Sequence, residues 1–164
     1  MYYINIFFLF SILGHFIENI FYTSKDSGIL FGCWTPIYGI GVSTIIFVYN
    51  TIIKKIKTNK YLKVFLVFII NAILLSLLEL IGGILIEKLL HITFWDYSKE
   101  AFSILRYTSL KMALIWGISG IIVTFILKNT IDKVIRYIPK FLTYILITLF
   151  IIDCILTLSP YMIK

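Results

Sequence analysis

Long apolar runs separated by short polar connections set the pattern of the whole chain. Each run is long enough to cross the hydrocarbon core of a bilayer, about 30 Å, as an α-helix that rises about 1.5 Å per residue. The sequence therefore predicts an all-α integral membrane protein, a bundle of five transmembrane helices forming one transmembrane domain over residues 1–164. The expected helices cover residues 2–23, 36–53, 63–90, 109–128 and 140–158.

Positive charges gather in two of the connections between these runs. The first connection carries Lys54, Lys55, Lys57, Lys60 and Lys63, and the second carries Lys128, Lys133, Arg136 and Lys140. By the positive-inside rule both connections lie in the cytoplasm. The N-terminus is then cytoplasmic, the C-terminus is external, and the polar loops 24–35 and 91–108 share the outer side.

Composition agrees with a membrane protein and argues against other classes. Hydrophobic residues make up 60% of the chain, above the roughly half that is usual in soluble domains. The net charge of +7 does not indicate nucleic-acid binding, because the basic residues do not spread over one face. We expect a multi-pass protein embedded in the lipid bilayer, and the excess of lysine over arginine favours a bacterial cytoplasmic membrane.

The second basic connection also has a helical pattern. Ile131, Val134, Ile135 and Ile138 recur at helical spacing among the cations. This pattern is typical of a short interfacial helix or of an element that docks a partner.

Three acids interrupt the apolar runs at similar depth. Glu18, Glu79 and Asp153 each fall in the outer half of an outward-running helix, and His15 lies one turn before Glu18. A charge in a membrane helix costs at least about 2.5 to 3.5 kcal/mol, so it is retained near a partner, water or a ligand. One interpretation is an acidic cavity that opens outward and binds a cationic group or exchanges protons, with His15 as a proton relay.

A structural interpretation competes with the cavity. In it the three acids are hydrogen-bonded to neighbouring helices or paired with Lys88, Arg106 or Lys111. His15 is then a packed, hydrogen-bonded side chain.

The external loop 91–108 carries the element Trp95-Asp96-Tyr97-Ser98. Asp96 either accepts hydrogen bonds from a helical segment that starts near Ser98 or binds a ligand. Trp95 and Tyr97 either anchor the loop among lipid headgroups or contact a substrate. Arg106, further along the loop, is a candidate countercharge for the acids.

No catalytic set is recognisable. The sequence contains no phosphate-binding Gly-x4-Gly-Lys-Ser/Thr loop, no GxSxG and no HExxH motif. We therefore assign no catalytic residue, no cofactor and no metal ligand. We expect the chain not to hydrolyse a nucleotide through such a loop by itself.

Several of these features occur together in a known order. The series comprises Gly14 with Glu18, Gly28, Gly32, Pro36-Ile37-Tyr38-Gly39, Glu79, Trp95-Asp96-Tyr97-Ser98, Leu110 and Trp116-Gly117. Over about the first four fifths of the chain it resembles the putative ABC-transporter type IV family of small bacterial membrane proteins, named as ABC transporter permeases. The chain departs from the family pattern at His15, where the family has Trp, at Asp26-Ser27, where it has Asn-Arg, and at Ser103 and Arg106, where it has Asn and Gly.

The resemblance implies a permease-type component that acts as an oligomer or with a separate ATP-hydrolysing subunit. The candidate substrate- or ion-binding residues are Glu18, Glu79, Asp96, Arg106, His15, Asp153, Tyr38, Trp95 and Tyr97. Two other classes stay open: a membrane-embedded enzyme whose acids and histidine act on a lipid headgroup, and a sensor or assembly factor that transports nothing.

Overall fold

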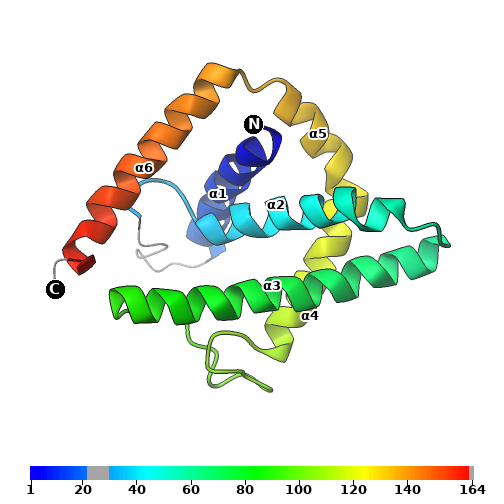
Figure 1. Cartoon of the computed structure of the whole chain (residues 1–164), viewed down its shortest axis with the longest axis horizontal. Helices are drawn as coiled ribbons and strands as arrows, with labels where there is room; N and C mark the ends of the chain where they lie inside the picture. Colours follow the sequence, from blue (N-terminus) through cyan, green and yellow to red (C-terminus); the bar gives the residue numbers. More distant parts are fainter. Residues whose placement is uncertain (22–29, 163–164) are drawn as a thin grey trace. The chain divides into compact units, whose positions relative to one another are not determined.

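The computed structural model describes residues 1–21 and 30–162, and these residues form helices joined by loops. In chain order the helices are α1 (Tyr2–Phe21), α2 (Pro36–Thr51), the 3-10 turn η1 (Ile53–Lys55), α3 (Lys60–Leu90), α4 (Leu110–Ile121), the π-helical segment η2 (Ile122–Leu127), α5 (Lys128–Arg136) and α6 (Lys140–Met162) (Figure 1). No named strand occurs in this described part of the chain. Residues 22–29, which include part of the expected first helix, part of the loop 24–35 and Gly28, lie outside it.

Five helical stretches are long and apolar enough to cross a membrane. They are Tyr2–Ile20, Pro36–Lys55, Lys60–Leu90, Leu110–Arg136 and Lys140–Pro160. The expected all-α class with five spans of transmembrane length is therefore confirmed. The orientation of the termini stays a prediction.

The fourth stretch is longer than the sequence pattern suggested. The helix that was expected to end near residue 128 continues through η2 and α5 to Arg136. The apolar run does end near Leu127, but Ile131 and Ile135 keep the helical spacing of buried positions, and both are buried. The helical spacing of apolar residues thus continues beyond the end of the continuous apolar run.

By its contacts the chain divides into two compact units, and each is described by itself. Unit 1 comprises Met1–Thr44 and Lys128–Lys164, and unit 2 comprises Ile45–Leu127. The expectation of one transmembrane domain over the whole chain stays an expectation.

In unit 2, α3 packs against α4 through one buried face. Val67, Asn71, Leu75, Glu79 and Gly83 follow one another at four-residue intervals and are all buried. Residues four apart lie on one side of a helix, so this spacing places Glu79 inside the helix pair and not toward lipid.

Two glycines on α4 allow the close approach. A Cβ at Gly117 would lie 2.6 Å from the Phe68 ring, and one at Gly120 would lie 2.8 Å from the Asn71 side chain. Small residues at such contacts are the usual way in which membrane helices pack tightly.

In unit 1, α1 contacts α5, α6 and the first turns of α2. The rings of Phe8, Trp34 and Phe150 form mutual edge-to-face contacts with centroids 5.8 to 5.9 Å apart. The buried Thr143 hydroxyl donates to Asn5 Oδ1 at 2.6 Å, which satisfies two polar side chains between α6 and α1.

Gly39 on α2 provides a test of this packing. A Cβ at this position would lie 2.4 Å from the Phe7 carbonyl oxygen on α1, so Gly39→Ala must move one helix backbone. We expect the free energy of unfolding to fall by about 1 to 3 kcal/mol, measured by denaturant titration of the purified protein. Gly82→Ala is the matched control, because no atom lies within 4 Å of the added methyl group. The control should leave the free energy of unfolding unchanged or raise it slightly. An equal fall of this free energy in both variants would contradict the close contact of Gly39 with α1.

Candidate functional site

Glu79 is the centre of the polar site in unit 2. Its side chain is buried, with 3% of the residue exposed, and its Oε1 accepts a hydrogen bond from the Tyr97 hydroxyl at 3.2 Å. The Thr108 hydroxyl and the Trp116 indole N–H lie beside the same carboxylate. Among the described residues no lysine or arginine forms an ion pair with it.

The carboxylate is only partly satisfied. Glu79 Oε2, Thr108 Oγ1 and Trp116 Nε1 are all buried and lack a hydrogen bond of normal geometry within the described part of the chain. Buried polar atoms without a partner are unfavourable by about 1 to 3 kcal/mol each. The site therefore holds one acceptor and two side chains able to donate that lie close to one another without a hydrogen bond of normal geometry.

Loop 91–109 brings Tyr97 to this carboxylate. The loop is held by hydrogen bonds from Tyr97 N to the Arg106 carbonyl at 2.8 Å and from the Trp95 indole to the Tyr107 carbonyl at 2.9 Å. An isolated antiparallel bridge joins Ile104 and Thr108. These contacts fold the loop back on itself. Trp95 helps to hold the loop in this conformation through its indole hydrogen bond.

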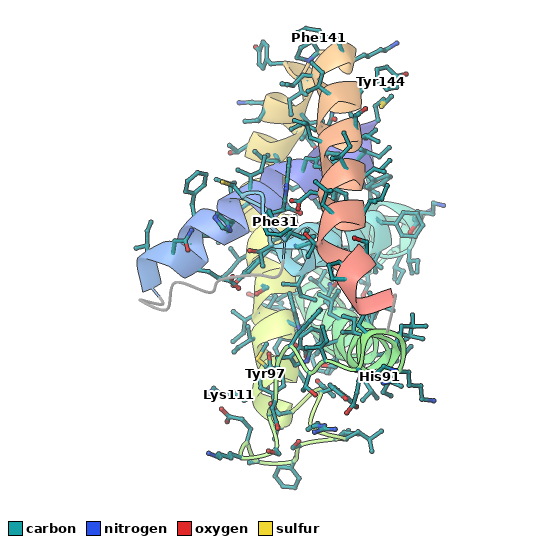
Figure 2. The ribbon with its side chains drawn as sticks, turned by 90° about the vertical axis from the view of Figure 1, so that its left-hand side faces the viewer. Phe31, His91, Tyr97, Lys111, Phe141 and Tyr144 are labelled. Atoms are coloured by element: carbon teal, nitrogen blue, oxygen red, sulfur yellow. The ribbon has the colours of Figure 1, made fainter. Side chains whose placement is uncertain are left out.

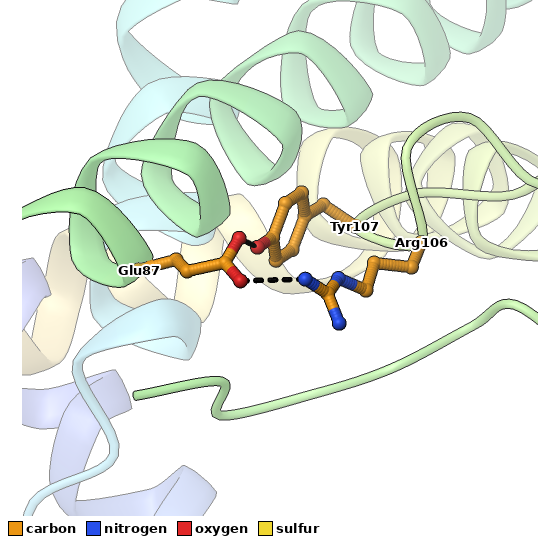
Figure 3. A network of polar contacts seen from close by, with 3 residues as sticks. All are labelled: Glu87, Arg106 and Tyr107. Atoms are coloured by element: carbon orange, nitrogen blue, oxygen red, sulfur yellow. Dashed lines mark hydrogen bonds and ion pairs between the residues drawn. The ribbon is translucent and has the colours of Figure 1, made fainter. Parts of the chain in front are cut away.

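A second carboxylate fastens the same loop to α3. Glu87 accepts hydrogen bonds from the Arg106 guanidinium, at 2.5 Å, and from the Tyr107 hydroxyl (Figure 3). Gly83, one turn earlier on α3, makes room for the Tyr107 ring, since a Cβ there would lie 2.3 Å from it. Arg106, expected as a countercharge for the membrane acids, thus has Glu87 as its ion-pair partner.

The loop has one further ionic contact at the start of α4. Lys111 donates to Glu100 at 2.7 Å, and Figure 2 shows Lys111 and Tyr97 near this end of α4. The pair is exposed and therefore contributes little stability by itself. Its position still ties the middle of the loop to the helix that follows.

Asp96 lies on the exposed side of the loop. Its Oδ1 accepts a hydrogen bond from the Ser98 backbone N–H at 2.7 Å, which closes a local turn. The expected hydrogen bond from the start of the following segment is therefore present, although that segment is a turn and not a helix.

In unit 1, Asp153 has every acceptor position used. Its Oδ1 accepts from the Phe31 N–H and the Thr157 hydroxyl, both at 3.0 Å. Its Oδ2 accepts from the Gly32 N–H at 2.8 Å and the Trp34 indole at 2.7 Å. Asp153 thus holds the segment before α2 against α6.

The other candidates in unit 1 surround the same segment. Glu18 is half-buried and accepts a hydrogen bond from the Thr35 hydroxyl at 3.3 Å. His15 Nε2 lies 2.9 Å from the Asn19 amide nitrogen, while its buried Nδ1 has no partner among the described residues. The Tyr38 ring packs against Gly14.

An apolar groove of about 510 Å³ also occurs in unit 1. It is lined by α1, α2 and α6, and the Ser43 hydroxyl on its wall already donates to the Tyr3 carbonyl at 3.2 Å. The groove presents almost no polar surface. It is therefore not a site for a polar or charged solute.

The structure thus sorts the candidate residues into two groups. Glu79 and the loop residues 95–97 and 106 belong to unit 2, whereas His15, Glu18, Tyr38 and Asp153 belong to unit 1. The expected meeting of Glu79 with Glu18 and Asp153 in one cavity stays a prediction.

Three contacts of the site were not expected from the sequence. Thr108 and Trp116 lie beside Glu79, and the Tyr107 hydroxyl donates to Glu87. The order of motifs along the chain contained a signal for Trp116, because that residue belongs to the series that carried the resemblance. Nothing in the spacing of residues along the sequence indicated that Thr108 lies beside Glu79.

The Asp96 turn makes a prediction about pH. Hydrogen bonds from the Ser98 backbone and side chain hold the pKa of Asp96 below its ordinary value of 3.8, with smaller help from Arg106 and Lys99. A lowered pKa means that the turn is stabilised above pH 3.8 and loses this support as the pH falls through the lowered value. Titration of the carboxyl carbon by ¹³C NMR should give a pKa below 3.8, and Ser98→Ala should raise it only part of the way. A value at or above 3.8 in the unsubstituted protein would refute the turn.

The Asp153 contacts predict a large loss of stability on truncation. Asp153→Ala removes the acceptor of four hydrogen bonds and leaves the buried Trp34 indole unpaired. We expect the free energy of unfolding to fall by at least about 2 kcal/mol, measured by denaturant titration. Thr148→Ala on the exposed side of α6 is the control and should change it by less than about 0.5 kcal/mol. A similar small change in both variants would show that Asp153 does not clamp the segment.

Comparison with known proteins returned one match. No curated protein and no solved structure matches the chain. The model of a family described as putative ABC-transporter type IV matches residues 5–158, which include the Glu79 site and the Asp153 contacts. Because this match covers nearly the whole sequence, the chain belongs to the putative ABC-transporter type IV family, as its motifs indicated.

Proposed function

We propose that the protein is a permease-type membrane component in which Glu79 binds a positively charged or hydrogen-donating group of a small solute. The observation that carries this proposal is the incompletely satisfied side of the Glu79 carboxylate. Among the described residues, the buried Oε2 has no hydrogen bond of normal geometry and no cation neutralises the carboxylate. A buried carboxylate that is incompletely hydrogen-bonded is stabilised most by a ligand that supplies a positive charge or a hydrogen-bond donor.

The surrounding donors support a polar solute over a bare ion. Thr108 and Trp116 each present a buried polar group beside the carboxylate without a normal hydrogen bond. A solute that carries both a cationic donor and an acceptor could satisfy all three groups at once. Asp153 does not offer such a site, because four hydrogen-bond donors already occupy its carboxylate oxygens.

The proposal includes a membrane orientation and an energy source. The two basic connections favour a cytoplasmic N-terminus and an external C-terminus in a bacterial cytoplasmic membrane, with loop 91–108 on the outer side. The sequence has no phosphate-binding loop, and its family is named for ABC transporters. A separate ATP-hydrolysing subunit would therefore supply the energy, and several copies of the chain could line one pathway.

Substitution of Glu79 tests the binding role. In Glu79→Gln the amide still accepts from the Tyr97 hydroxyl, so the protein's abundance and melting temperature should stay close to those of the unsubstituted protein. Binding of radiolabelled ethanolamine, a probe that carries an ammonium donor and a hydroxyl acceptor, should fall more than tenfold. Equilibrium dialysis against the purified full-length protein measures this binding.

Glu100→Gln is the matched control, because it makes the same chemical change at an exposed carboxylate whose ion pair with Lys111 contributes little stability. It should retain probe binding. Lower abundance of Glu79→Gln with unchanged binding would assign Glu79 a purely structural role. Absence of saturable binding in the unsubstituted protein would also contradict the proposal.

A further inference from the structure

The turn between α5 and α6 exposes positive charges beside aromatic rings. Lys133, Arg136 and Lys140 are exposed. They form no ion pair within the described ranges of the chain. They lie within one or two helical turns of the connection at residues 137–139. Three cations are therefore left available to an external partner.

The acid of the same region cannot neutralise them. Asp132 is held by Lys128, with Nζ to Oδ2 at 2.6 Å, and by the Tyr2 hydroxyl. Both partners lie in unit 1 and are partly buried. The one carboxylate of α5 is thus paired inside the unit, and Arg136 interacts with it only at longer range and without an ion pair.

Aromatic side chains surround the cations. Tyr137 is 87% exposed, Phe141 66% and Tyr144 57%. Phe141 and Tyr144 lie three residues apart on α6, and Figure 2 shows both at the start of this helix. Exposed tyrosine next to lysine and arginine is typical of the headgroup layer of a bilayer.

The lengths of the candidate spans place the turn between α5 and α6 at the depth of the headgroup layer. The candidate span Leu110–Arg136 has 27 residues, which is about 40 Å of helix at about 1.5 Å per residue. The hydrocarbon core is about 30 Å thick, so roughly the last two turns of one end extend into the headgroup layer. The next span starts at Lys140, so the connection 137–139 must lie at a membrane boundary.

The apolar side of α5 is already packed inside unit 1. Ile131 and Ile135 are buried, and α5 contacts α1 within unit 1. The helix therefore cannot bind lipid by immersing an apolar face, as a surface helix does. Its outward side presents mainly charge, with Val134 as an exposed apolar side chain.

We propose that Lys133, Arg136 and Lys140, flanked by Tyr137, Phe141 and Tyr144, form a binding surface for the headgroups of anionic phospholipids. The surface holds lipid through charge at phosphate depth, while the rings contact the glycerol region and the first acyl carbons. Arginine and lysine both suit phosphate, and arginine can bind it with two hydrogen bonds. This inference does not depend on the role of Glu79.

Lipid retention by the full-length protein tests the surface. We expect native mass spectrometry to show that the protein in detergent retains phosphatidylglycerol over phosphatidylcholine with the same acyl chains. The triple variant Lys133→Gln, Arg136→Gln, Lys140→Gln should lose roughly fivefold of this preference for each charge removed. Raised salt should weaken the preference of the unsubstituted protein, because the charges are exposed.

Two matched variants make the test specific. Lys54→Gln, Lys55→Gln, Lys57→Gln removes the same number of exposed charges from the other basic connection and should retain most of the preference. Lys133→Arg, Arg136→Lys, Lys140→Arg keeps every charge and should retain it fully, which separates binding from misfolding. Equal loss in both glutamine variants, or no preference in the unsubstituted protein, would overturn the proposal. So would a glutamine variant that keeps its lipid and instead loses a co-purifying acidic protein.

Discussion

A polar group inside a membrane span must find its partner within the protein, because the hydrocarbon offers none. This constraint explains where the loops of the chain fold. Asp153 on α6 draws the segment 31–34 onto its helix through backbone and indole donors. Glu79 and Glu87 on α3 do the same for loop 91–109 through tyrosine and arginine. In each unit the loop is therefore positioned by carboxylates of a helix and needs no core of its own.

The two buried carboxylates differ in how far this requirement is met. Asp153 accepts from four donors and has no remaining capacity, which is the pattern of a structural clamp. Among the described residues, Glu79 has one normal hydrogen bond, from a tyrosine, and two further polar side chains beside it that form no hydrogen bond of normal geometry. Sequence position cannot distinguish these cases, since both are acids within apolar helices. The distinction depends on which loop atoms return to each helix.

The helices were predictable from the sequence, and the site was predictable only in part. Apolar length reports membrane crossing directly, so the five spans could be read from the residues. The helical spacing of Ile131 and Ile135 indicated a short helix after the fourth apolar run, and α5 is that helix; its direct continuation from the fourth span could not be seen, because Lys128 and Asp132 interrupt the apolar run while pairing with each other. The hydrogen bond from Tyr97 to Glu79 could not be derived, since the loop that carries Tyr97 has left-handed backbone at Phe102, Leu105 and Arg106. Such conformations at residues other than glycine leave no signal in a hydropathy pattern.

Arg106 shows how the loop is kept in place despite an unfavourable backbone conformation. Its φ of 63° lies in the left-handed region that glycine occupies without strain. An arginine there is disfavoured by about 1 to 2 kcal/mol. Its guanidinium forms the ion pair with Glu87 and lies 5.6 Å from the centre of the Tyr107 ring. These contacts offset the backbone strain, and they explain why an arginine can hold a loop conformation that a glycine would adopt freely.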